Sequence, residues 1–209
     1  MDTLISMVSA YLLGSIPTAV WIGMTYYGID PREHGSKNAG ATNTFRVLGK
    51  KPGILVLFID IIKGAVAACV PYALIDDPIL YRDVLINLQI LAAISAVFGH
   101  IFPVFARFKG GKGVATSLGV IIGIQPLAAL MCLMVFIIVF VSSKYVSLGA
   151  ISAAVCFPFV VRFVLCENNL WLSVFSITLS ILVIIAHRKN INRLINGSEN
   201  KMNLFKKGS

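Results

Sequence analysis

The spacing of the apolar residues is the feature that most constrains this chain. Polar loops separate six apolar runs, which cover residues 3–27, 53–75, 84–105, 114–141, 146–165 and 170–186. Most runs are close to the 20 or so residues that a helix needs to cross the hydrocarbon core of a bilayer. Hydrophobic residues make up 57% of the chain and charged residues only 13%, which is typical of a multi-pass membrane protein. We therefore expect an all-α integral membrane bundle that forms a single domain over residues 1–209.

The fourth run decides how many spans the chain has. It is longer than one crossing requires, and Gln125 is followed near its middle by Pro126, a helix breaker. The chain therefore has six spans, or seven if this run folds back at Gln125-Pro126 into two short helices.

The distribution of charge favours seven spans. Lys and Arg gather in the loops 28–52 and 107–112 and in the tail after residue 186, whereas the connection 76–83 is acidic. Basic loops face the cytoplasm, and all three do so only if the number of spans is odd. We predict seven transmembrane helices, an outside N-terminus, a cytoplasmic C-terminus and a flexible cytoplasmic tail over residues 198–209.

Composition also argues against several kinds of partner. The net charge of +9 is explained by cytoplasmic loops, and no soluble domain interleaves basic with aromatic residues, so we expect no nucleic-acid partner. The four cysteines form no CxxC pair and have no histidine at metal spacing, which predicts free, packed thiols. The loops lack the clustered carboxylates of a hard-cation site, so we expect no metal and no cofactor.

A basic, glycine-rich loop, residues 107–113, joins the third and fourth runs. Glycine lets the backbone adopt positive φ and approach a ligand, and a helix beginning near Val114 would add its N-terminal dipole. Lysines at the same point make a phosphate group the natural ligand. The loop is not a Walker A motif, because Ala106 replaces the first glycine and Gly113 follows Lys112. The alternative is a basic turn that only fixes topology.

A second polar segment, residues 34–46, is dense in small residues that form hydrogen bonds. Arg46 at its end offers a bidentate guanidinium for phosphate. A simpler interpretation is a turn followed by a helix with Asn43 or Thr44 as its N-cap, but that accounts for one polar residue only.

A third polar segment follows the last run. His187 and Asn190 are three residues apart and would share one face of a helix. Glu199 could orient a basic group or pair with Arg193. The alternative is a positively charged anchor that leads into a solvated tail.

Two charged residues lie inside the second run, where Asp60 and Lys63 are three residues apart. Intramembrane charges are costly and are candidates for function. A pair with this spacing neutralises itself, so a structural ion pair is at least as well supported. We keep both residues out of the catalytic set.

Taken together, the three polar segments resemble the motifs of the bacterial acyl-phosphate:glycerol-3-phosphate acyltransferases of the PlsY type. That family's Gly-Ser-Gly-Asn and Gly-Ala-Thr-Asn elements are similar to residues 35–43, and its Phe-Lys-Gly-Gly-Lys-Gly-Val-Ala-Thr is residues 108–116 unbroken. Its third motif matches residues 187–199. The resemblance covers essentially the whole chain, including residues 14–17. Lys37 stands where the family usually has glycine, and a positive φ there would cost roughly 1 kcal/mol or more.

The resemblance implies a membrane acyltransferase. It would transfer a fatty acyl group from acyl phosphate to the 1-hydroxyl of sn-glycerol 3-phosphate, giving lysophosphatidic acid and inorganic phosphate. This is the first step of phospholipid biosynthesis in the bacterial plasma (inner) membrane, with the active site at the cytoplasmic face. The implied partners are acyl phosphate, sn-glycerol 3-phosphate and membrane lipids.

The resemblance also implies a set of site residues. The expected catalytic residues are Ser36, Lys112, His187 and Asn190. The expected substrate-binding residues are Asn38, Gly40, Thr42, Asn43, Arg46, Gly110, Gly111, Gly113, Ser147, Arg188 and Glu199. Because an acyl phosphate is already activated, proximity and charge stabilisation could suffice, which suits a chain with neither a His-x4-Asp pair nor a GxSxG elbow.

Within that set, we assign Lys112 and the amides of residues 110–113 to the phosphate and its developing charge. Arg46, Ser36, His187 and Asn190 would hold glycerol 3-phosphate. The proton acceptor is either His187 or the departing phosphate, and the sequence does not separate them.

Two other classes of function remain as alternatives. A phosphate or organophosphate transporter would suit the intramembrane charges, but we find no internal repeat and the polar motifs lie at one membrane face. A purely structural assembly protein would leave the glycine-rich loops unexplained.

Overall fold

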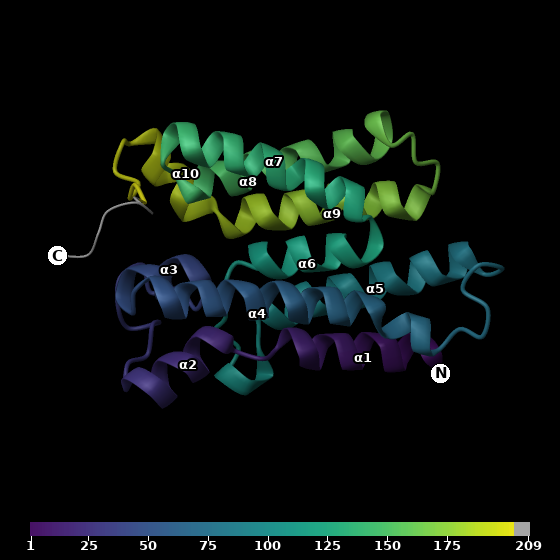
Figure 1. Cartoon of the computed structure of the whole chain (residues 1–209), viewed down its shortest axis with the longest axis horizontal. Coiled ribbons are helices and arrows are strands. Elements are labelled where there is room, and N and C mark those ends of the chain that lie inside the picture. The colour runs from purple at the N-terminus through teal and green to yellow at the C-terminus, as the bar shows by residue number, and fades with distance from the viewer. Residues whose placement is uncertain (203–209) are drawn as a thin grey trace.

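The computed structural model describes residues 1–202, in which helices lie side by side along the long axis and no strand occurs (Figure 1). The α-helices are α1 (Asp2–Gly14), α2 (Thr18–Tyr27), α3 (Ala41–Val47), α4 (Lys50–Cys69), α5 (Arg82–Ile101), α6 (Val114–Ile124), α7 (Pro126–Ser143), α8 (Val146–Phe159), α9 (Leu170–Ala186) and α10 (Arg188–Ile195). Two 3-10 turns, η1 (Val70–Ala73) and η2 (Val104–Ala106), and the π-helical turn η3 (Val160–Val164) extend α4, α5 and α8.

Five helical segments are long and apolar enough to cross a bilayer: Asp2–Tyr27, Lys50–Ala73, Arg82–Ala106, Pro126–Ser143 and Val146–Val164. α9 counts as a sixth when it is taken together with α10, from which it is bent by 61°. α6 is apolar but has only 11 residues. The chain is therefore an all-helical membrane protein with five or six helices of full spanning length within residues 1–202.

The break at Gln125-Pro126 lies where the sequence predicts it. α6 ends at Ile124 and α7 begins at Pro126, which occupies the first helical turn, where its missing N–H costs nothing. The two helices are unequal, however. We expected two short helices around this break, and only α6 is short. α7 has 18 residues, which is enough for a full crossing.

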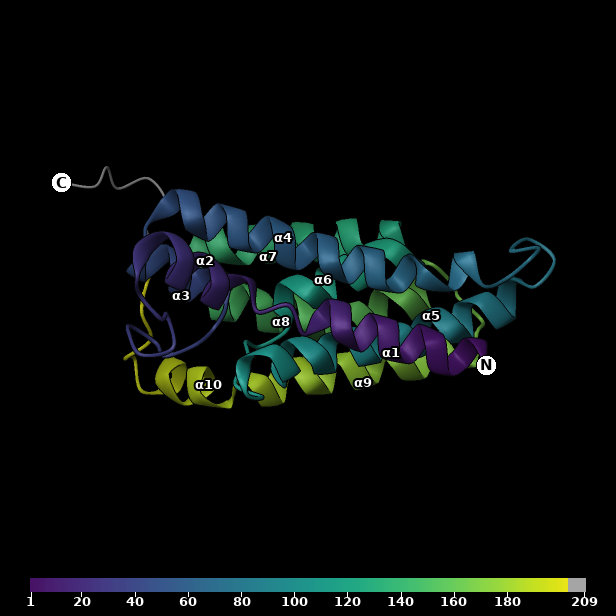
Figure 2. The same cartoon turned by 90° about the horizontal axis from the view of Figure 1, so that it is seen from below.

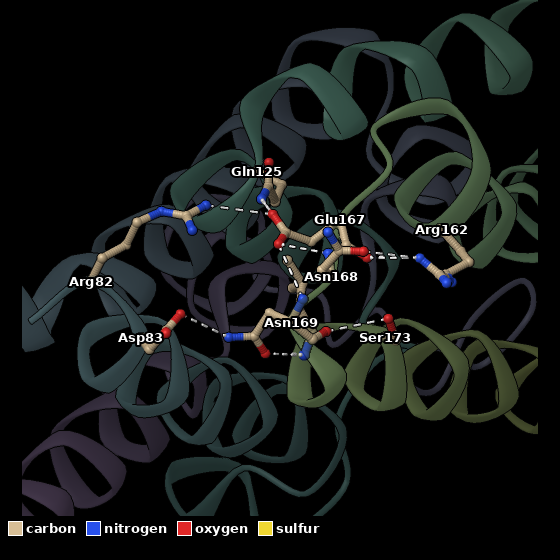
Figure 3. Close-up of polar contacts among 9 residues, drawn as sticks. Arg82, Asp83, Gln125, Arg162, Glu167, Asn168, Asn169 and Ser173 are labelled. Carbon is tan, nitrogen blue, oxygen red and sulfur yellow. Dashed lines mark hydrogen bonds and ion pairs between the residues drawn. The ribbon is translucent and has the colours of Figure 1, made fainter.

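A polar cluster, shown in Figure 3, holds this break in place. Glu167 accepts a hydrogen bond from Gln125 Nε2 at 3.2 Å and is paired with Arg82 at 3.5 Å. Asn169 caps α9 by accepting the Leu172 N–H at 3.0 Å. The cluster thereby joins the start of α5, the end of α6 and the start of α9.

Close packing fixes α6 against α4. A Cβ added to Gly119 would lie 2.0 Å from the carbonyl oxygen of Ile61, and one added to Gly64 would lie 2.3 Å from that of Thr116. Only glycine allows two membrane helices to approach this closely. The short α6 is therefore held along its length by the longer α4.

The two ends of the bundle differ. In both views α2, α3 and α10 lie at one end and the N-terminus lies at the other (Figures 1 and 2). The predicted flexible tail needs a correction at this end, because the Met202 N–H donates to the Lys144 carbonyl at 2.9 Å and Glu199 is buried. Residues 198–202 are thus packed against the bundle, and residues 203–209 lie outside the described range.

The cysteines are free thiols within the described residues, as predicted. Their packing differs from the prediction: Cys132 is buried and Cys156 is partly buried, whereas Cys69 and Cys166 are exposed.

Candidate active site

One side chain organises the first polar loop. The Asn43 Oδ1 accepts the Ser36 N–H at 2.8 Å, and its Nδ2 donates to the carbonyls of Pro31, His34 and Asn38 at 2.6, 3.1 and 3.0 Å. Asn43 is buried at 1% exposure. The simpler interpretation, with Asn43 or Thr44 as N-cap, does not hold, because α3 begins at Ala41 after Gly40. Asn43 lies inside the helix and its side chain folds the preceding loop around itself.

Left-handed backbone shapes the same loop. Gly35 has φ of +58° and Lys37 has φ of +56°. The glycine that the family usually has in place of Lys37 would suit this conformation without strain. The lysine side chain itself is exposed, so its effect on the loop is confined to the backbone.

The glycine-rich loop is attached to the end of α5. The Gly110 N–H donates to Ile101 O and the Gly111 N–H to His100 O, each at 3.1 Å. These two amides are therefore engaged within the protein, which contradicts their predicted role as phosphate ligands. Gly113 has φ of +78° and leads into α6, which begins at Val114 as predicted.

The tail folds back and Glu199 accepts three hydrogen bonds. Its Oε1 accepts from Asn190 Nδ2 at 2.8 Å and from Ser147 Oγ at 3.1 Å, and its Oε2 accepts from Arg193 Nε at 2.7 Å. Asn190, held in this way, presents its Oδ1 to the Lys112 ammonium, which donates to it. Three segments far apart in sequence thus meet through a continuous hydrogen-bonded chain.

These groups surround one cavity of about 410 Å³. Twelve of the predicted site residues line it: Ser36, Asn38, Gly40, Thr42, Asn43, Arg46, Lys112, Gly113, Ser147, His187, Asn190 and Glu199. Gly110, Gly111 and Arg188 do not, and Arg188 is exposed. Away from the loops the cavity runs between helices and is lined by apolar side chains, among them Ile121, Leu133, Phe136, Phe157 and Leu179.

Four further polar residues line this cavity, and the sequence analysis assigns none of them to the site: Asp60, His100, Ser117 and Ser180. Asp60 is one of the two intramembrane charges that the sequence analysis keeps out of the catalytic set. The pair with Lys63 exists, at 2.8 Å, but Asp60 also reaches the cavity wall. His100 is a single histidine inside the apolar run 84–105, and nothing in the sequence connects it with the glycine-rich loop.

Burial sets the charge of the two candidate catalytic groups with titratable side chains. It lowers the pKa of Lys112 to about 8, with Glu199 opposing the shift and Arg193 and Arg46 adding to it. Burial and the nearby Lys112 charge lower the pKa of His187 to about 4. Burial alone would raise the pKa of Glu199, but its hydrogen bonds from Arg193 and Asn190 bring that pKa below its ordinary value.

At neutral pH the cavity therefore contains an ammonium, a neutral imidazole and a carboxylate that is fully engaged by donors. The His187 Nδ1 lies 2.8 Å from the Val183 carbonyl and so carries the ring proton, which leaves Nε2 as an acceptor. Burial also lowers the pKa of Arg46, which stays protonated. A cavity with cationic groups at one end and apolar walls at the other fits an amphiphile with an anionic head.

Fold and site together define a helical membrane protein with a cavity for an anionic amphiphile. The chain belongs to the glycerol-3-phosphate acyltransferase family, whose model, described as "Glycerol-3-phosphate acyltransferase", matches residues 4–197. It is accordingly an enzyme of that activity, and the resemblance seen in the sequence is confirmed.

Individual relatives agree over nearly the full chain. A glycerol-3-phosphate acyltransferase of Salinibacter ruber is 44% identical over 214 residues, covering 97% of this chain and 93% of the relative. One of Fusobacterium nucleatum is 42% identical, covering 93% and 95%. The crystal structure of PlsY (YgiH), an integral membrane glycerol 3-phosphate acyltransferase in its glycerol 3-phosphate form, superposes with a TM-score of 0.85 at 36% identity, covering 99% of this chain and all of that one. Its lysophosphatidic acid form gives a TM-score of 0.82.

Proposed function

We propose that this enzyme uses acyl phosphate as the donor and acylates the 1-hydroxyl of sn-glycerol 3-phosphate. The products are lysophosphatidic acid and inorganic phosphate. The observation that carries the proposal is the two-part cavity, because a donor with a phosphate head and a fatty chain matches its cationic and apolar ends. The reported forms of the PlsY structure, with glycerol 3-phosphate and with lysophosphatidic acid, are those of a relative that handles the same acceptor and product.

In the proposed reaction, the Lys112 ammonium and the N-terminus of α6 at Gly113 bind the donor phosphate. The acceptor hydroxyl attacks the acyl carbonyl, a new C–O ester bond forms, and the bond from the acyl carbon to the phosphate oxygen breaks. Positive charge at Lys112 stabilises the departing phosphate. Alignment of two bound reactants supplies much of the acceleration, on the order of 7–11 kcal/mol for well-placed groups.

The remaining groups hold the acceptor. Arg46, Ser36, Asn38 and Thr42 bind glycerol 3-phosphate, and His187 accepts a hydrogen bond from its hydroxyl at Nε2. Asn190 orients Lys112, while Ser147 and Glu199 orient Asn190. Gly40 and Asn43 shape the loop that carries the acceptor-binding side chains. Gly110, Gly111 and Arg188 do not line the cavity and have no direct role in this scheme.

The hydroxyl proton ends on the departing phosphate. A neutral His187 with a pKa near 4 is a weaker base than the departing phosphate, which gains a negatively charged oxygen as the bond to the acyl carbon breaks. The imidazole therefore orients the hydroxyl, and the phosphate that leaves takes the proton.

We further propose that the enzyme lies in the plasma membrane with this site on the cytoplasmic side. The basic segments that surround the cavity support this orientation. With α6 counted as a short span and α9 as a full one, the number of crossings is seven, the N-terminus is outside and the C-terminus is cytoplasmic.

The donor is tested with purified protein in lipid and labelled glycerol 3-phosphate, offered acyl phosphate or acyl-CoA separately. We expect lysophosphatidic acid from acyl phosphate only, and a loss of roughly 100-fold or more in Lys112→Ala. Lys109→Ala is the matched control, because Lys109 is exposed in the same loop and does not line the cavity. Product from acyl-CoA alone would refute the donor, and a normal rate in Lys112→Ala would refute the site.

A further inference from the structure

A buried polar cluster lies directly behind the glycine-rich loop, and the proposed reaction does not use it. Asp60 Oδ1 accepts a hydrogen bond from Thr18 Oγ1 at 3.0 Å and pairs with Lys63 Nζ at 2.8 Å. Lys63 also donates to the Ile16 carbonyl at 2.7 Å, in the break between α1 and α2. The side chains of Asp60 and Lys63 are only 2% and 4% exposed.

His100 connects this cluster to the loop. Its Nδ1 lies 3.8 Å from Asp60 Oδ1, and its ring is buried at 6% exposure. Its main-chain carbonyl accepts the Gly111 N–H. A Cβ added to Gly111 would lie 2.2 Å from His100 Nε2, so the ring packs directly against the main chain of the residue that precedes Lys112.

Burying these polar groups contributes little to the stability of the fold. A buried ion pair gains little over apolar residues of the same size, because removing both charges from water costs about as much as their attraction returns. Here two charged groups and an imidazole are buried at one point, and that point contacts the loop that carries Lys112. A constraint on the loop explains why the polar groups stand there.

We propose that His100, oriented by Asp60, is a positioning residue that holds Gly111 and thereby sets the place of the Lys112 ammonium in the cavity. The proposal rests on the proposed function, because it takes Lys112 as the group that stabilises the departing phosphate. Lys112 is held from two sides: Asn190 contacts its ammonium, and the His100 ring packs against the main chain of the preceding residue, Gly111. His100 also lines the cavity, but in this role its ring acts through Gly111.

The test is a double-mutant cycle on the full-length enzyme in lipid. His100→Ala should lower kcat by roughly 100-fold, the loss typical of a catalytic group displaced by about 1 Å. The KM for glycerol 3-phosphate should change by less than about threefold, because the acceptor-binding side chains stay in place. In a Lys112→Ala background, followed over hours with labelled substrate, His100→Ala should cost at most about twofold more.

Gly111→Ala provides a second variant that leaves every functional group intact. Its methyl group meets the His100 ring and displaces the loop, so it should lower kcat in the wild-type background and have little effect beside Lys112→Ala. If His100→Ala does not accumulate in the membrane, Gly111→Ala still allows the same double-mutant cycle to be measured.

Gln89→Leu is the matched control for stability. Gln89 is buried on the same helix and donates to the carbonyls of Ala68 and Gly123, away from the loop. Gln89→Leu should lower the thermal midpoint. Any fold-change in rate that it causes should be the same in the wild-type enzyme and in the Lys112→Ala variant.

Multiplying effects of His100→Ala and Lys112→Ala, or a large rise in KM, would overturn the positioning role and indicate a group that touches substrate. If Lys112→Ala keeps a normal rate, the proposed function itself fails, which is a different result. A non-additive cycle together with an unchanged KM supports the proposal.

Discussion

The depressed pKa of Lys112 predicts how the enzyme responds to alkaline pH. Burial lowers this pKa to about 8, and in the proposed reaction the ammonium is the form that stabilises the departing phosphate. The lysine is then about 90% protonated at pH 7 and about 10% at pH 9. We expect kcat/KM, which reports groups of the free enzyme, to fall about tenfold between pH 7 and 9 and tenfold for each unit above that.

Other groups near Lys112 do not titrate in this window. Arg46 stays charged, Glu199 has a lowered pKa and is ionised, and His187 with a pKa near 4 is already neutral. The second ionisation of a phosphate monoester, near pH 6, is also complete. Bound phosphate favours the ammonium, so the fall in kcat should lie at higher pH than the fall in kcat/KM.

Initial rates of lysophosphatidic acid formation between pH 6.5 and 10 measure both profiles. Lys112→Arg should abolish the fall, at some cost in rate, because a guanidinium stays protonated throughout. Lys109→Arg, in the exposed part of the loop, should leave the profile unchanged. A level kcat/KM up to pH 9.5, or the same fall in Lys112→Arg, would refute the argument.

Three further predictions concern stability and the first loop. The pKa of Lys112 is lowered from an ordinary value of 10.5 to about 8 in the folded protein, so at neutral pH the buried charge disfavours the folded state. Lys112→Met should therefore raise the free energy of unfolding by on the order of 1–3 kcal/mol, measured as a higher thermal midpoint, while activity is lost. In Asn43→Asp a carboxylate would face the carbonyls of Pro31, His34 and Asn38, to which the amide now donates. This substitution should lower the rate at least 100-fold and increase cleavage of residues 31–40 by protease. A normal rate would show that these contacts are dispensable. Lys37→Gly should change the free energy of unfolding by less than about 1 kcal/mol and leave the rate intact, because relief of left-handed strain offsets added chain entropy; a larger loss measured in urea would reveal an unrecognised role for the side chain.

Local patterns were sufficient to predict much of this fold. Apolar run lengths and Pro126 gave the helices and the break between α6 and α7, since these follow from hydrophobic thickness and from a missing N–H. The expectation of two short helices around that break was wrong for α7, which has the length of a full crossing, because the apolar pattern does not show where each helix ends in the folded bundle.

The candidate site was predicted only as a set of residues at one membrane face. The backbone bonds of Gly110 and Gly111 to α5 could not be foreseen, because they depend on how the loop folds back after η2. The pairing of Glu199 with Arg193 was predicted and is confirmed, but the packing of residues 198–202 against the bundle was missed, because a polar tail has no local signal that distinguishes a bond to a distant segment, such as that from Ser147, from solvation. His100 was missed because its partners come from other helices.

The two-part cavity also determines how the concentration of each substrate affects the rate. Its polar end is lined by loop residues that meet water, whereas its other end lies among helices of the membrane bundle. Under the proposed function, the relevant concentration of the acceptor is its amount per volume of water, and that of the fatty donor is its amount per area of bilayer. Diluting the donor with inert lipid, at constant total amount, should therefore slow the reaction as strongly as removing the same fraction of it. The proposed donor would then act through its surface density in the membrane that holds the enzyme.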